Sequence, residues 1–175
     1  MRSTKVVIAA ALALAACVSG TVRVHDVCSE EALSTVPGGL PVGTIEKTFE
    51  TQADFSEVLS KVDSYGDVTV DLTRIELGSQ ENVDVSFVEH VRIEFVTANG
   101  TSELLGEQDV QGPLQSIVLK VGQTSPEMQR DIKTGPFKLK ISGRLRSPQS
   151  SVTPVIRVCG SVTGEGSYSV TQIGK

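Results

Sequence analysis

The stretch FKLKISGRLR, residues 137–146, has the clearest periodicity of the sequence and decides the fold class. Apolar side chains occupy every second position, with Gly143 as the one interruption, and lysine, serine or arginine lies between them. A period of two places these two sets of side chains on opposite faces of a β-strand. The stretch therefore predicts a strand with one face in a core and one in water.

Similar alternation recurs along the chain from residue 44 onward. It predicts further strands at 44–49, 68–77, 83–87, 91–95, 102–107, 114–121 and 156–170, with a bulge near Thr73 and Arg74. Asn99-Gly100 is a strong hairpin signal between two of them. The last segment fits either one long strand or a hairpin that turns through residues 164–166.

One segment has a helical period instead. Apolar residues at i, i+3, i+4 and i+7 predict a short amphipathic helix, with Asp54 as its cap and Gly66 as its stop; they are Phe55, Val58, Leu59 and Val62. Ser125-Pro126-Glu127 predicts only a brief helical turn that buries Met128 and Ile132.

Many short strands between turn signals, with one short helix, predict an all-β fold for residues 44–175. The expected architecture is an antiparallel, immunoglobulin-like β-sandwich rather than a parallel sheet. The chain has no tryptophan, the residue typical of antibody domains, so the prediction extends to the architecture only.

The N-terminus has the features of an export signal. Arg2 and Lys5 precede an uninterrupted apolar run at 6–16. This run is too short to cross the hydrocarbon core of a membrane, which takes about 20 residues. Residues 1–16 are therefore predicted to be a cleaved signal peptide. The run ends in Leu14-Ala15-Ala16-Cys17, which resembles the lipobox of bacterial lipoproteins.

This resemblance implies that the chain is cut before Cys17, that the Cys17 sulfur receives a diacylglyceryl group, and that the new amino terminus is acylated. Val18, where an aspartate often marks inner-membrane retention, resembles the exported kind. The resemblance thus implies a lipid-anchored cell-envelope protein in the outer membrane. The alternative is a secreted, unanchored module, because Ala13-Leu14-Ala15 also matches an ordinary cleavage site.

Residues 17–43 contain several glycine, proline and serine residues and predict a lipidated N-terminus followed by an irregular tether. If Cys17 is lipidated, Cys28 and Cys159 remain, and we expect them to form a disulfide on the polar side of the last strand. Two separate thiols are the alternative, because sequence alone does not place their Cβ atoms within bonding distance.

The formal net charge is −5 at pH 7, and loss of Arg2 and Lys5 with the signal makes the mature chain more acidic. An acidic domain does not suggest a nucleic-acid partner. The wet face of 137–146 nevertheless has a basic stripe of Lys138, Lys140, Arg144 and Arg146. This stripe is a candidate surface for an anionic envelope polymer, a lipid headgroup or an acidic envelope protein; the alternative is protection of an exposed strand edge.

No cofactor or metal site is expected. His25 and Cys28 lie three residues apart, but a zinc site needs three or four ligands and the only other histidine is His90. The nucleophile motif Gly-x-Ser-x-Gly is absent, so no catalytic residue is assigned and a non-catalytic binding or structural module is expected. The alternative is a lipid-anchored hydrolase that uses His90 with a distant acid and serine.

Overall fold

The structure is a computed structural model that describes residues 17–39, 44–62, 67–81 and 83–169. The predicted signal peptide and Gly66 lie outside the described residues. The described strands are β1 (Cys17–Ala32), β2 (Thr44–Ala53), β3 (Asp67–Ser79), β4 (Val88–Val96), β5 (Ser102–Asp109), β6 (Ile117–Lys120), β7 (Phe137–Arg146) and β8 (Pro154–Ser169). Helix α1 spans Ser56–Val62, and helix α2 spans Pro126–Thr134.

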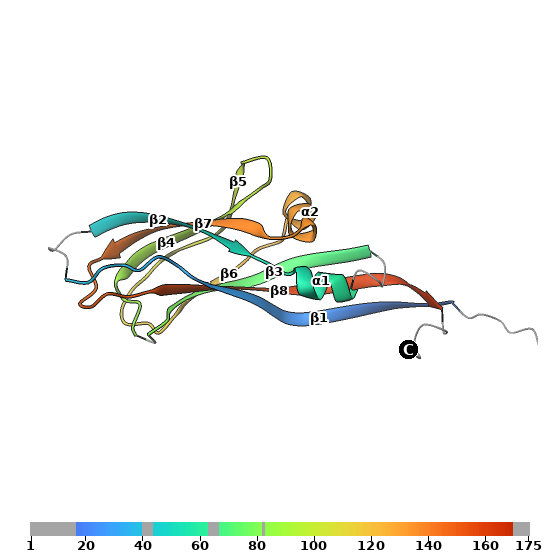
Figure 1. Cartoon of the computed structure of the whole chain (residues 1–175), viewed down its shortest axis with the longest axis horizontal. Helices are drawn as coiled ribbons and strands as arrows, with labels where there is room; N and C mark the ends of the chain where they lie inside the picture. Colours follow the sequence, from blue (N-terminus) through green and yellow to red (C-terminus); the bar gives the residue numbers. More distant parts are fainter. Residues whose placement is uncertain (1–16, 40–43, 63–66, 82, 170–175) are drawn as a thin grey trace, which may run out of the picture.

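The strands form two four-stranded sheets with the orders β1-β8-β3-β6 and β2-β7-β4-β5, packed as two layers (Figure 1). Every pairing is antiparallel, and the pairs are nested: β1 pairs with β8, β2 with β7, β3 with β6, and β4 with β5. This nesting is the double Greek key of a jelly roll. The predicted antiparallel sandwich is confirmed, and its connectivity is that of a jelly roll.

Strand β7 has the alternation that its sequence predicts. Phe137, Leu139, Ile141 and Leu145 are buried, and the side chains between them lie on the outer face. The Phe137 ring stacks on Phe95 with centroids 5.3 Å apart and meets Phe55 edge-on at 5.7 Å. The three rings thus connect β4, β7 and the residue before α1. The rest of the core is mostly aliphatic.

Helix α1 forms where predicted and packs on the sheet that contains β8 (Figure 1). The Asp54 carboxylate accepts a hydrogen bond of 2.8 Å from the Ser56 amide, which caps the helix. Phe55 packs against Gly160 of β8, where a Cβ would lie 3.3 Å from its ring and 2.8 Å from the Asp71 carbonyl oxygen. Glycine at this position lets the helix start approach the sheet closely.

Helix α2 is longer than the brief turn predicted for it. It has nine residues, Pro126 in its first turn, and buried Met128 and Ile132, as the sequence indicated. The Ser125 hydroxyl accepts a 3.2 Å hydrogen bond from the Met128 amide and acts as the N-cap.

The prediction of a strand at 83–87 is wrong, because β4 begins at Val88. The Asp84 carboxylate accepts hydrogen bonds from the Ser86 amide at 2.6 Å and the Leu114 amide at 3.1 Å. These bonds hold the segment in a turn, although Val85 and Phe87 are buried as the alternation suggested.

The prediction of an irregular tether is wrong over Cys17–Ala32, which is strand β1. It pairs with β8 from Cys17 opposite Ser169 to Ala32 opposite Val155. A bulge between Val24 and Val27 shifts its register, and Asp26 takes a positive φ of 53° there. The bulge interrupts the period of two, which explains why alternation did not reveal this strand.

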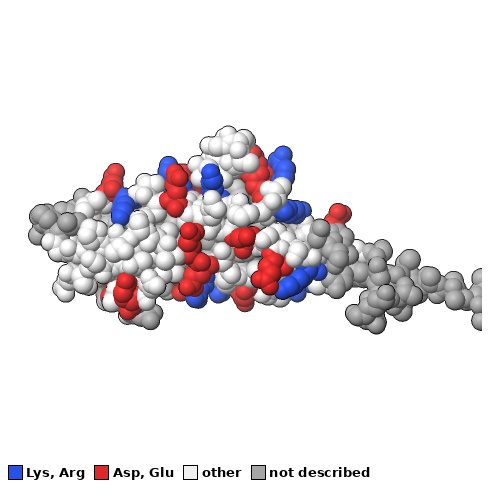
Figure 2. Space-filling model, viewed as in Figure 1, with Lys and Arg blue, Asp and Glu red and all other residues white. Residues whose placement is uncertain are grey.

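The other strand predictions differ mainly in length. The first strand continues to Ala53, the one expected at 114–121 is limited to β6, and β8 is one continuous strand rather than a hairpin. The predicted bulge in β3 is present between Leu72 and Arg74, and the hairpin at Asn99-Gly100 joins β4 to β5. Acidic and basic side chains are interspersed over the face shown in Figure 2.

Candidate functional site

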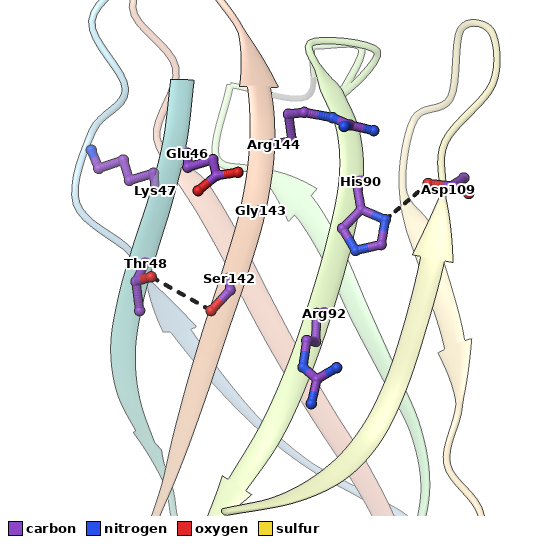
Figure 3. Close-up of a pocket in the computed structure, with 9 residues that line it drawn as sticks. All are labelled: Glu46, Lys47, Thr48, His90, Arg92, Asp109, Ser142, Gly143 and Arg144. Atoms are coloured by element: carbon purple, nitrogen blue, oxygen red, sulfur yellow. Dashed lines mark hydrogen bonds and ion pairs between the residues drawn. The ribbon is translucent and has the colours of Figure 1, made fainter. Parts of the chain in front are cut away.

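A polar groove of about 500 Å³ lies on the outer face of sheet β2-β7-β4-β5 (Figure 3). Ser142 and Gly143 of β7 form its floor, Glu46 and Thr48 of β2 line one wall, and β4 supplies the other wall. The strand register places Thr48 opposite Ser142, and their hydroxyl oxygens lie 3.5 Å apart. Small residues at the centre of the sheet, between larger charged ones, thus produce the groove.

Arg92 is the cation of the β4 wall, and Asp109 of β5 also lines the groove. Arg92 donates hydrogen bonds to Glu94 at 2.9 Å and to Glu107 at 3.4 Å. The bond to Glu94 raises the pKa of Arg92, with the nearby charge of Glu94 as a further cause, so the guanidinium stays charged. Arg144 of β7 reaches the same side and lies 3.3 Å from Glu89 through its Nε atom. Figure 3 shows the two guanidinium groups on either side of His90.

His90 lies half-buried between two carboxylates on β5. Its Nδ1 atom is 2.9 Å from Asp109, and its Nε2 atom is 3.1 Å from Glu107. In a Ser-His-acid triad one ring nitrogen faces the acid and the other faces the nucleophilic hydroxyl. Here both nitrogens face carboxylates, and the Ser142 hydroxyl pairs with Thr48 instead. The arrangement is suited to binding rather than to activation of Ser142.

The predicted basic stripe is paired with acids rather than free. β7 lies between β2 and β4, so protection of an exposed edge does not explain these residues. Three of its four cations form ion pairs with glutamates of β4: Lys140 with Glu94 at 3.7 Å, Arg144 with Glu89 at 3.3 Å and Arg146 with Glu89 at 2.5 Å. Lys138 is exposed further along β7, and of the four residues Arg144 alone lines the groove.

Sequence reasoning missed Glu46, Thr48, Arg92 and Asp109 as residues of one site. The alternation of apolar and polar residues places Arg92 on the outer face of its strand, but the alternation does not show which strands are the neighbours of that strand. The groove depends on the pairing of β7 with both β2 and β4, which joins residues far apart in the chain.

Cys28 and Cys159 form a disulfide, as predicted. The expectation that Cys159 lies on the polar, solvent-exposed side of its strand is wrong, because the exposed fraction of Cys159 is 0%. β8 is a central strand, and Cys28 of β1 and Arg74 of β3 flank Cys159 on its two sides. A bridged Cys28 is not available as a metal ligand beside His25. Across the described residues, no cluster of three or more His, Cys, Asp and Glu side chains could hold a metal ion.

The backbone of Cys17 opens β1, and its side chain lies outside the part that the structure describes. Within that part, neither helix has the length and apolar character needed to cross a membrane.

No protein-family model matches the chain, and no curated protein matches its sequence. Among solved structures, that of turnip yellow mosaic virus at 100 K is 15% identical with a TM-score of 0.47, over 86% of this chain and 96% of that chain. The decameric BFDV capsid protein is 12% identical with a TM-score of 0.45, over 83% of this chain and 98% of that chain. At these identities the similarity concerns the β-sandwich and carries no conclusion about function.

Proposed function

We propose that this protein is a lipid-anchored lipoprotein of the bacterial cell envelope, held in the outer membrane by acyl groups on Cys17. Its jelly-roll domain is a non-catalytic binding module. The groove on sheet β2-β7-β4-β5 takes carboxylate or phosphate groups of an envelope polymer or partner protein.

The pairing of the cysteines carries the proposal of an anchor. The chain has three cysteines, and the Cys28–Cys159 disulfide accounts for two of them. The remaining one, Cys17, is the residue that the lipobox resemblance marks for acylation. Disulfides persist in oxidising compartments outside the cytosol, which agrees with export by the predicted signal peptide.

The donors of the groove support an anionic ligand. Arg92 and Arg144 provide charged donors on one side of the groove, and the hydroxyls of Ser142 on the floor and Thr48 on the opposite wall provide neutral ones. Both arginines are already paired with glutamates, so an incoming anion must displace a glutamate carboxylate from the arginine it binds. The net gain in free energy is therefore small, and the affinity for a single anionic group is low. A membrane anchor raises the local concentration of envelope partners, so low affinity is sufficient.

The intact mass of the protein recovered from its native membrane tests the anchor. We expect a chain that starts at Cys17 and carries acyl groups, with a gain of one hydrogen per bridged sulfur on reduction. An unmodified chain that starts at Ala16 would contradict the anchor and support the secreted alternative.

Titration with inorganic phosphate, followed by NMR amide shifts, tests the groove. We expect shifts at Arg92, Ser142 and Arg144, and a severalfold weaker affinity in Arg144→Gln. Arg157→Gln is the matched control, because Arg157 is 48% exposed against 53% for Arg144 and is also paired with a glutamate, but on the opposite sheet. Equal losses in both variants would show non-specific attraction and contradict the groove as the site.

A further inference from the structure

We infer that the end of the domain formed by the start of β1, the end of β8 and the start of β3 is a membrane-contact surface, so that the domain stands end-on upon a lipid bilayer. This inference rests on the proposed anchor at Cys17 and adds a fixed orientation to it.

The first observation is that no linker separates the anchor from the fold. Strand β1 begins at Cys17 itself, which pairs with Ser169, and Gly20 pairs with Gly166. The same two strands are joined covalently by the Cys28–Cys159 disulfide. A flexible linker would let the domain rotate freely above its anchor, whereas a paired strand transmits the position of Cys17 directly to the sheet.

The second observation is the shape of the molecule. β1, β8 and β3 continue beyond the other sheet at this end, and α1 lies on them (Figure 1). The sixteen residues of β1 span about 50 Å at roughly 3.3 Å per residue. The anchor therefore lies at one tip of an elongated body, far from the loop that joins β3 to β4.

The third observation is the distribution of charge along β1. Residues 18–22 are Val-Ser-Gly-Thr-Val, and their β8 partners at 164–168 are Gly-Glu-Gly-Ser-Tyr. Glu165, opposite Thr21, is the one charged residue in these five pairs. The rest of β1 includes exposed Arg23, Asp26, Glu30 and Glu31.

These charges favour end-on contact over a domain lying flat. Contact along the length of β1 would take its exposed charges out of water, which costs free energy, whereas contact through the tip avoids most of that cost. Asp67 of β3 pairs with Glu165 on the side opposite Thr21, so two acidic residues are neighbours near the tip, which suits zwitterionic headgroups better than anionic ones.

End-on contact also determines where the groove lies. Glu46 and Thr48 belong to the half of β2 that is remote from α1, because β2 runs from Thr44 to Ala53 and leads into that helix. The groove therefore faces the aqueous space away from the membrane, where it meets polymers or proteins rather than headgroups of its own leaflet.

The chain has no tryptophan, so a single introduced tryptophan reports on one position. Thr21→Trp places it on an exposed residue near the tip, and Val83→Trp places it on an exposed residue in the loop between β3 and β4. Each variant, recovered with its acyl groups, is reconstituted into phosphatidylcholine vesicles whose acyl chains are brominated. Unchanged melting temperatures relative to the parent show that both variants keep the fold.

We expect Thr21→Trp to lose most of its emission relative to vesicles without bromine, and Val83→Trp to keep its emission. Equal quenching of both positions would show a domain lying flat, and quenching of neither would show a domain held off the bilayer. Either result overturns the inference while the anchor stands.

Failure of the anchor is a separate result. If the intact mass shows no acyl groups, the Cys17 thiol of the secreted chain is coupled to a maleimide-headgroup lipid, because the other two cysteines are bridged. The same pair of tryptophan variants then decides whether an anchor at residue 17 brings the tip to the bilayer.

Discussion

Cys28 and Cys159 lie directly opposite one another on β1 and β8, with Cα atoms 4.1 Å apart, and their disulfide closes a loop of sequence separation 131. A crosslink over so long a loop restricts the unfolded chain. We expect the double variant Cys28→Ala, Cys159→Ala to lose about 2–4 kcal/mol of unfolding free energy, measured by urea denaturation.

Reductant provides the matched control for this prediction. It should lower the denaturation midpoint of the parent protein and leave that of the double variant unchanged, because the variant has no bridge to break. If the variant and the parent unfold at the same urea concentration without reductant, the bridge does not stabilise the fold.

Gly160 and Gly78 are both strand glycines, but they differ in the space around them. A Cβ at Gly160 would lie 2.8 Å from the Asp71 carbonyl oxygen, which belongs to the backbone and cannot move away easily, whereas a Cβ at Gly78 meets nothing within 4 Å. We expect Gly160→Ala to lose about 1–3 kcal/mol of unfolding free energy. Gly78→Ala should change it by at most about 0.5 kcal/mol. Equal effects in thermal unfolding would show that close packing at Gly160 is not the cause.

The strands that could be predicted are those whose period of two is unbroken. The alternation in β7 is continuous, and its core face follows from its sequence. β1 was missed because the bulge at His25 and Asp26 shifts its apolar residues from one parity to the other. The segment at 83–87 was mistaken for a strand because hydrogen bonds to the Asp84 side chain hold a turn in which apolar residues still alternate.

The candidate site was harder to predict than the fold. Period two shows which face a side chain lies on, and it correctly placed Arg144 on the wet face. It contains no information on which strands become neighbours, and the groove exists because β7 pairs with β2 on one side and β4 on the other. The ion pairs that occupy the basic stripe have the same origin, since Glu89 and Glu94 come from the neighbouring strand.

Glu81 links the end of β3 to the loop before β8 in a pH-dependent way. Its carboxylate accepts hydrogen bonds from the Thr153 amide at 3.1 and 3.3 Å, and these bonds lower the pKa of Glu81. A lowered folded-state pKa stabilises the fold above the unfolded-state pKa, and this contribution is lost as the pH falls through the folded-state value.

We therefore expect Glu81→Gln to be less stable than the parent at pH 7, with a difference that shrinks as the pH falls below about 4. Urea denaturation at several pH values measures it. Glu50→Gln is the control, because within the described residues no hydrogen bond to its carboxylate is seen, and it should show a smaller effect at pH 7. A difference that stays constant between pH 7 and pH 3 would contradict the role of the Glu81 charge.

Glu89 holds two arginines beside the groove, Arg144 at 3.3 Å and Arg146 at 2.5 Å, and its own side chain is half-buried. Glu89→Gln removes the negative charge that competes with an incoming anion for Arg144. We expect severalfold tighter binding of inorganic phosphate in the groove and a loss of about 1 kcal/mol or less of unfolding free energy.

Glu30→Gln is the matched control, because Glu30 holds Arg157 at 2.6 Å on the opposite sheet and its removal makes the same change in net charge. Tighter phosphate binding in Glu89→Gln alone would identify Arg144 as the anion-binding group, whereas the same gain in both variants would trace it to net charge and contradict a specific site.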